Sequence, residues 1–181
     1  VAIDSRADDY EQAEADPEFP GFHRIEYSLW EKGSTEGLDE VADKLLADVK
    51  ELHGRIEGLT FPPEKVVGGA AVLMEEVAFT KISGEENRYS RTDLWDFKAN
   101  FDGAYKIVEL VRPLIEETEG EFLKTVDANF DKVYTTLTKY EDGDGYVSYL
   151  ELTDADRNVL SAAVNTLAED LSTLRGKLGL D

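Results

Sequence analysis

The 181-residue chain contains no cysteine and only two histidines, His23 and His53. Without cysteine it can form no disulfide, no thiolate metal site and no covalent intermediate on a cysteine nucleophile. The two histidines lie far apart, and the sequence holds neither the two-histidine zinc-protease pattern nor a P-loop, a Rossmann glycine fingerprint or a Gly-x-Ser-x-Gly elbow. We therefore do not expect a two-histidine zinc site or a thiol enzyme.

Positive charge and long apolar runs are also scarce. The chain has 19 Lys and Arg against 40 Asp and Glu, a formal net charge of −21, which repels nucleic acid and anionic lipid and attracts cations. No apolar run reaches the ~18 residues of a transmembrane helix, and nothing at the start is typical of a signal peptide. Because Val1 is not an initiator methionine, we expect the chain to be part of a longer protein.

Helical periodicity dominates what is present. Over residues 38–56 the apolar residues recur at spacings of three and four, the pattern of an amphipathic helix. Pro113 predicts a kink within its helix. No strand pattern of comparable length is found, so we predict an all-α fold, a helical bundle of six or seven helices. The other predicted helical segments are residues 1–14, 22–30, 63–82, 92–117, 122–140 and 153–174.

His23 and Glu26 form the most informative pair of polar residues. Side chains three positions apart share one face of a helix, so an imidazole and a carboxylate point the same way. Imidazole suits zinc, copper and iron, and carboxylate suits harder ions, which makes the pair a common two-ligand unit for a transition metal. Such pairs also arise by chance, so the pair alone leaves metal binding open. Aromatic residues nearby could wall the site from water: Phe19, Phe22, Tyr27 and Trp30.

Three further features receive structural interpretations. Residues 140–151 overlay a calcium-binding loop, but Tyr140 occupies the first position, where such a loop needs an acidic oxygen. The Asp-Gly-Asp-Gly stretch is typical of an ordinary turn, so we do not expect calcium at 140–151. His53 has no paired acid and is interpreted as a surface residue. Trp30 and Trp95 are interpreted as core residues rather than as a platform for a ligand.

Longer motifs carry a resemblance to a known family. They are residues 4–11 (DSRADDYE), 21–26 (GFHRIE), 59–71 (LTFPPEKVVGGAA), 81–86 (KISGEE), 92–97 (TDLWDF), 167–171 (LAEDL) and 178–180 (LGL). Over essentially its whole length the chain resembles the imelysin-like family. It is most similar to the periplasmic members that belong to bacterial iron-uptake systems.

The resemblance implies an all-helical domain built from two bundle-like halves and located in the periplasm. Residues 1–181 would form a single imelysin-like domain that lacks upstream helices, which in the family contribute further glutamates. His23 and Glu26 match the metal-binding motif of the family, and Asp4 and Glu86 match further acids of the same site. The implied role is delivery of iron to a membrane permease, with a haem-peroxidase-like protein as the other usual component.

The leading hypothesis is therefore a metal-binding module of an iron-uptake system rather than an enzyme. Asp4, Glu26 and Glu86 would supply hard oxygen ligands suited to Fe(III), and His23 would add a nitrogen. Copper or zinc could occupy the same site, because affinity for simple ligand sets rises from iron to copper. The site would hold the ion and pass it on without turnover.

Two alternatives from other classes stay open. In a metallopeptidase, Glu26 would act as the base and a bound ion as the Lewis acid. In a protein that binds an acidic polysaccharide, divalent cations would have to bridge the two negative partners. A basic and aromatic cleft with Arg88, Tyr89 and Arg91 would favour that reading.

Overall fold

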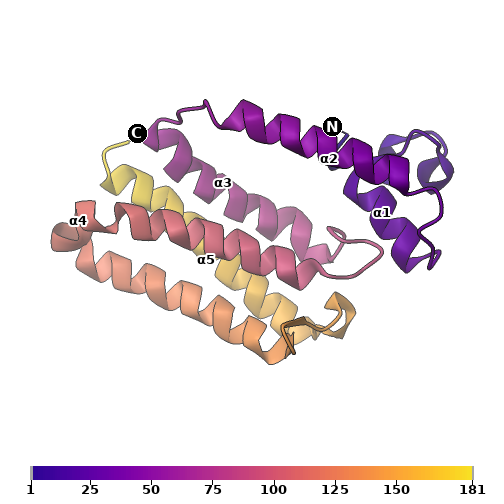
Figure 1. Ribbon diagram of the computed structural model, residues 1–181. Helices are drawn as coiled ribbons and strands as arrows, with labels where there is room; N and C mark the ends of the chain where they lie inside the picture. Colours follow the sequence, from indigo (N-terminus) through magenta and orange to yellow (C-terminus); the bar gives the residue numbers. More distant parts are fainter. Residues whose placement is uncertain (1, 181) are drawn as a thin grey trace. The chain divides into compact units, whose positions relative to one another are not determined.

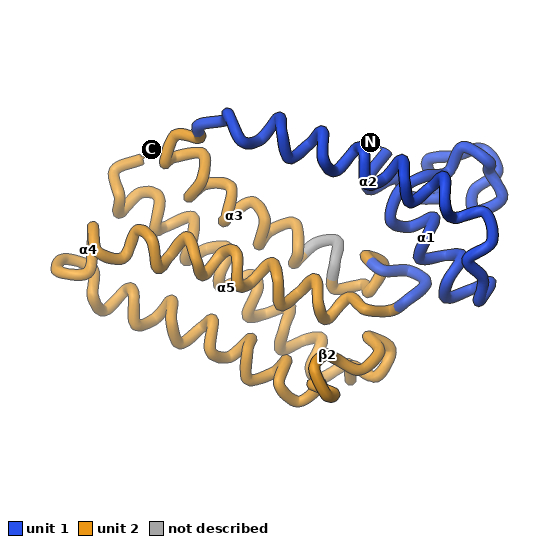
Figure 2. The backbone as a smooth tube through the Cα atoms, in the orientation of Figure 1, with its two compact units in different colours: residues 1–60, 87–90 blue, residues 61–86, 91–181 orange. Residues whose placement is uncertain are grey.

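The computed structural model describes residues 2–180, apart from the side chains of residues 79–81, and α-helices make up most of it (Figure 1). The chain divides into two compact units, coloured separately in Figure 2. Unit 1 comprises residues 1–60 and 87–90, and unit 2 comprises residues 61–86 and 91–181. The predicted all-α class is confirmed, whereas the extent of the imelysin-like domain stays a prediction. No helix in the described part is long and apolar enough to cross a membrane.

Unit 1 contains two α-helices, α1 (Gly21–Trp30) and α2 (Asp39–Ile56), which contact each other. The helix predicted over residues 1–14 is wrong, because only short 3₁₀ turns form there, at Ala7–Asp9 and Ala13–Ala15. Asp9 in this segment bonds to nearby backbone. The Arg6 N–H donates to Asp9 Oδ2 over 2.9 Å. Such local bonds compete with helix formation.

Helix α2 confirms the predicted amphipathic helix, but its apolar face is largely uncovered. Leu45 is the one residue of α2 that is buried, while Leu46, Leu52 and Ile56 are exposed. His53 is also exposed, which confirms its interpretation as a surface residue.

Unit 2 is built from α3 (Pro63–Thr80), α4 (Asp93–Leu137) and α5 (Asp154–Lys177), with 3₁₀ turns at Lys81–Ser83, Thr138–Tyr140 and Tyr149–Glu151. Each of the three α-helices contacts the other two. Apolar residues at helical spacing from all three elements form one core, and removal of their surface from water is the main force that stabilises such a bundle. Fully buried members of the core include Met74, Val77, Leu94, Phe101, Val126, Phe130, Val133, Val164, Leu167 and Leu171.

Helix α4 joins two of the predicted helices and doubles back on itself in Figure 1. The interruption lies at Glu119, whose φ of −123° and ψ of 26° are not helical. It falls between the helices predicted over residues 92–117 and 122–140, and the kink at Pro113 stays a prediction. Gly120 follows Glu119, and a glycine is a weak point in a helix. The described residues thus hold five labelled α-helices, or six when the two arms of α4 are counted separately, in agreement with the six or seven predicted.

Between α4 and α5 the chain forms a small hairpin from β1 (Glu141–Asp142) and β2 (Gly145–Tyr146). Gly143 lies in its turn with a φ of +58°, a backbone conformation that glycine adopts readily. Tyr140, the first position of the supposed calcium loop, donates its hydroxyl to Asp156 Oδ2 over 2.6 Å. The segment is thus a hairpin followed by a 3₁₀ turn.

The two tryptophans are not core residues, contrary to the prediction. Trp30 is 55% exposed and Trp95 is 49% exposed. Trp30 lies at the last position of α1, and Trp95 lies in the first turn of α4, where its ring meets the hairpin residue Tyr146.

Substitution of Thr153 tests whether the N-terminal cap of α5 stabilises unit 2. Thr153 Oγ1 accepts a hydrogen bond from the Asp156 N–H at 3.1 Å. We expect Thr153→Ala to lower the free energy of unfolding by about 1 kcal/mol, measured by urea titration. Thr173→Ala is the matched control, since Thr173 is an exposed position of the same helix. Equal effects of the two substitutions would contradict a role for the cap.

Candidate metal centre

The site begins with a close approach of two backbone segments at the start of α1. The Phe22 N–H donates to the Ile3 carbonyl oxygen over 3.0 Å. Gly21 has a φ of +79°, and a Cβ atom at this position would lie 2.4 Å from the same oxygen. Only glycine fits such a conformation and such a contact. The residues next to Ile3 are thereby held against α1, which brings Asp4 to His23.

His23 is bonded through both ring nitrogens. Its Nδ1 lies 2.7 Å from Glu26 Oε2, and its Nε2 lies 3.0 Å from Asp4 Oδ1. His23 and Glu26 are buried, while the side chain of Asp4 is 66% exposed. The prediction that His23 and Glu26 share one face of a helix is thus met, and the distant Asp4 joins them. The imidazole is thus held between a buried carboxylate and an exposed one.

Glu26 is held by a segment far away in the sequence. Its Oε1 accepts hydrogen bonds from the Tyr89 N–H at 3.0 Å, the Ser90 N–H at 2.8 Å and the Ser90 hydroxyl at 2.9 Å. Together with the bond to His23, four donors surround this one carboxylate. Tyr89 and Ser90 belong to unit 1, and no pattern in the sequence predicted their hydrogen bonds to Glu26.

The two buried groups shift each other's pKa in opposite directions. Burial lowers the pKa of His23, but its hydrogen bonds to Glu26 and Asp4 outweigh burial and Arg6, and the net pKa is raised. Burial raises the pKa of Glu26, but the hydrogen bonds from His23 and from residues 89 and 90 outweigh it, and the net pKa is lowered. Both shifts favour an ionised pair, an imidazolium beside a carboxylate.

Arginines lie beside this pair. A small pocket next to His23 is lined by Arg6, Ala7, Arg88 and Tyr89. Arg88 forms a two-pronged ion pair with Asp8, at 3.0 and 2.6 Å. The Tyr89 hydroxyl donates to Glu14 Oε1, and burial followed by this bond raises the pKa of Tyr89 to about 12. These cationic and aromatic groups are therefore bonded to acids of unit 1.

Glu86, the fourth predicted ligand, belongs to unit 2. There its backbone N–H donates to Asp93 Oδ1 over 2.9 Å. The structure brings together Asp4, His23 and Glu26, whereas a role for Glu86 stays a prediction. Within residues 2–180, excepting the side chains of 79–81, no three His, Asp or Glu side chains are arranged around a point that could hold a metal ion. His23 Nε2 would have to exchange its hydrogen bond to Asp4 for a metal bond.

Comparison with known proteins identifies the family of this chain. The model of the imelysin family, peptidase family M75, matches residues 1–174. This chain belongs to the imelysin family. The resemblance noted in the motifs of the sequence is thus confirmed, and it extends well beyond the site.

Related imelysin-family proteins are named iron uptake system component EfeO. The chain is 59% identical to the EfeO protein of Yersinia pseudotuberculosis serotype I over 180 residues and 58% identical to that of Escherichia coli O157:H7 over 180 residues. Each match covers 99% of this chain and 48% of the relative. The chain therefore spans about half the length of the curated relatives it matches.

Gly21→Ala tests whether the backbone contact positions the site. The added Cβ would meet the Ile3 oxygen in a strained conformation, so we expect the free energy of unfolding to fall by about 2 kcal/mol. Gly33→Ala is the control, because Gly33 also has a positive φ, +59°, but no heavy atom lies within 4 Å of its Cβ position. Equal losses in urea unfolding would show that the approach of Ile3 is unimportant.

The ionised pair predicts a pH dependence of stability. Because the pKa of His23 is raised, its protonation stabilises the fold fully below pH 6.5, the ordinary pKa of histidine. This stabilisation is lost as the pH rises through the folded-state pKa. Because the pKa of Glu26 is lowered, its ionised form stabilises the fold fully above pH 4.5, the ordinary pKa of glutamate. This stabilisation is lost as the pH falls through the folded-state pKa.

The stabilisation by the pair should thus be greatest between about pH 4.5 and 6.5. Urea unfolding of the metal-free protein and of His23→Gln would give the difference in unfolding free energy at each pH. We expect this difference to shrink towards pH 8. A difference that grows in alkali would contradict the ionised pair.

Proposed function

We propose that this chain binds iron as the cargo of a bacterial iron-uptake system and holds the ion for transfer without chemical turnover. The observation that carries the proposal is the fixed orientation of His23, whose Nδ1 is bonded to Glu26 while its Nε2 faces the exposed carboxylate of Asp4. The names of the relatives support iron as the ion, since they are called components of an iron uptake system.

Asp4 and His23 have the geometry of two ligands of one ion. Metal bonds of about 2.1 Å at right angles place two donor atoms about 3 Å apart. His23 Nε2 and Asp4 Oδ1 lie 3.0 Å apart, so an ion could replace the proton between them with little movement of either side chain. Because metal and proton compete for the same atoms, affinity should fall in acid.

Glu26 then serves to orient His23 rather than to bind the ion directly. A carboxylate on the second ring nitrogen of a metal-binding histidine fixes its tautomer and strengthens the metal bond. Oε1 of Glu26 already accepts three hydrogen bonds, which leaves this carboxylate poorly placed as a ligand. Two protein ligands do not fill the coordination shell of Fe(III), so the ion would need further ligands.

Carboxylate oxygen suits Fe(III), and the histidine would also accept copper or zinc. In the cell, the module would act in the periplasm and pass iron to a membrane permease, alongside a peroxidase-like component. These partners and this location rest on the family resemblance.

The two alternative functions gain no support from the site. A peptidase needs a general base with access to water, but Glu26 is buried and bonded on both oxygens. A polysaccharide cleft would need available basic and aromatic groups. Arg88 is paired with Asp8, the Tyr89 hydroxyl is bonded to Glu14, and Arg91 lies in unit 2 and donates to the Gly84 carbonyl.

Calorimetric titration with Fe(III) nitrilotriacetate, Cu(II) and Zn(II) tests the proposal. We expect binding of one ion per chain, lost in His23→Ala and weakened about tenfold in Glu26→Gln, because the orienting carboxylate is removed. His53→Ala removes an exposed histidine and should leave affinity unchanged. Binding that survives His23→Ala, or that His53→Ala weakens equally, would overturn the assignment.

A further inference from the structure

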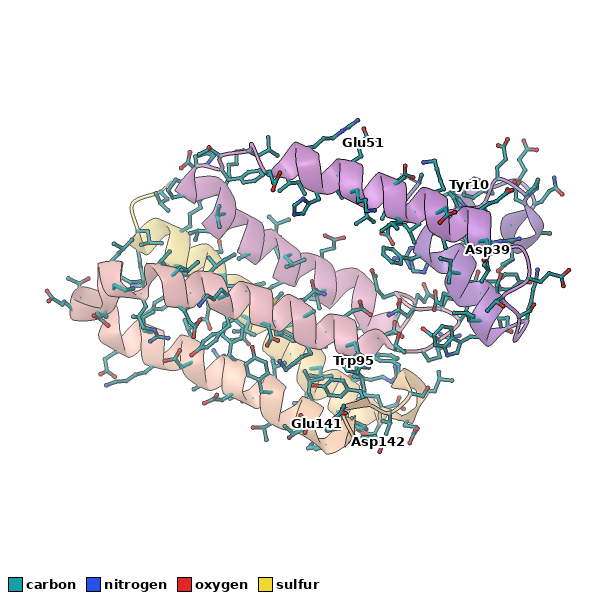
Figure 3. All side chains as sticks on the ribbon, in the orientation of Figure 1. Tyr10, Asp39, Glu51, Trp95, Glu141 and Asp142 are labelled. Atoms are coloured by element: carbon teal, nitrogen blue, oxygen red, sulfur yellow. The ribbon has the colours of Figure 1, made fainter. Side chains whose placement is uncertain are left out.

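A second candidate site lies in unit 2, at the end where α4 begins and the hairpin folds against it. Figure 3 shows Trp95 and Glu141 near one another at this end. Here the surface is hollowed into a pocket of about 510 Å³, within the size range of small-molecule and side-chain pockets. Its lining comes from α4 and the hairpin and consists of Trp95, Lys98, Ala99, Asp102, Glu141, Gly143, Asp144, Gly145 and Tyr146.

The indole of Trp95 is fixed in place although half of it is exposed. A Cβ atom on Gly145 would lie 2.5 Å from the six-membered ring of Trp95, so the ring rests directly on the hairpin backbone. The Tyr146 ring meets the indole edge-on, at 5.6 Å between centroids and 88° between planes. These two contacts fix the indole, which remains 49% exposed at the pocket. A rigid aromatic surface loses little conformational entropy when a ligand stacks on it.

The acids around the indole are not balanced by bases. Lys98, the one basic residue of the lining, is paired with Asp102 at 2.5 Å. Glu141 and Asp144 are exposed, and neither takes part in an ion pair with any described residue. The pocket thus offers an aromatic face beside two uncompensated carboxylates.

We propose that this pocket binds an arginine side chain from a basic segment of a partner protein. A guanidinium is planar and stacks on an indole, and its fork of N–H donors matches carboxylate oxygens. Charge complementarity favours such a segment, because the chain carries a net charge of −21. An ammonium group offers no flat face to the ring, so arginine fits better than lysine.

This site is independent of the proposed metal centre. All of its residues belong to unit 2, whereas Asp4, His23 and Glu26 belong to unit 1. It differs also from the calcium-loop interpretation, because the ligand would contact the Trp95 ring and not the loop alone.

The two tryptophans make a direct test possible by NMR. The chain gives two indole N–H signals, from Trp30 and Trp95, and Trp30→Phe assigns them. The probe is the peptide acetyl-Gly-Arg-Gly-Arg-Gly-amide, with peptides carrying lysine or glutamine in place of arginine. We expect the arginine peptide to shift the Trp95 signal saturably and to leave the Trp30 signal unmoved. The lysine peptide should bind several-fold more weakly, and the glutamine peptide should have no effect.

A matched pair of charge variants completes the test. The double substitution Glu141→Gln and Asp144→Asn should raise the dissociation constant of the arginine peptide about fivefold. Glu116→Gln with Glu117→Gln removes the same charge from exposed positions of α4 away from the pocket and should leave the constant unchanged. Joint movement of both indole signals, equal binding of the glutamine peptide, or equal effects of the two charge variants would overturn the proposal.

Discussion

A carboxylate as buried as that of Glu26 is stable in its charged form only when hydrogen-bond donors surround it. The donors come from His23 in the same helix and from the backbone and side chain of residues 89 and 90. The same set of bonds fixes the ring of His23 and ties residues 87–90 into unit 1. The geometry offered to a metal ion is therefore a consequence of how unit 1 satisfies one buried acid.

Both candidate sites also depend on a glycine that lets backbone approach another group. Gly21 admits the Ile3 carbonyl, which leads Asp4 to His23, and Gly145 admits the indole of Trp95. In each case a side chain would occupy the space that the neighbouring group needs. The absence of a side chain at each glycine thus allows a residue from a distant part of the chain, Asp4 or Trp95, to take its place in the site.

The acidic surface acts on both sites at long range, while local chemistry separates what they bind. A net charge of −21 raises the local concentration of any cation. Nitrogen and oxygen donors 3.0 Å apart suit a metal ion at His23, whereas an aromatic face beside two carboxylates suits a guanidinium at Trp95. One global property would therefore favour both of the proposed ligands, although they differ in kind.

The sequence by itself determined the helical class, most of the helices and the pairing of His23 with Glu26, because these depend on contacts within a few residues. Its motifs also identified the family correctly. Predictions from local patterns were wrong where side-chain hydrogen bonds or packing against distant segments decided the structure. In the first segment the Arg6 N–H donates to Asp9 Oδ2, and only short 3₁₀ turns form where a helix was predicted.

Only the tertiary structure decided what completes each site. Nothing near Glu26 in the sequence indicates that Tyr89 and Ser90 donate hydrogen bonds to it. Trp95 is a large aromatic residue of the kind expected in a core, but about half of it is exposed beside the hairpin. Periodicity tells which face of a helix is apolar. Periodicity does not show which distant segment donates hydrogen bonds to a buried acid such as Glu26. It also does not show whether a ring such as that of Trp95 will be covered, since both depend on long-range packing of the folded chain.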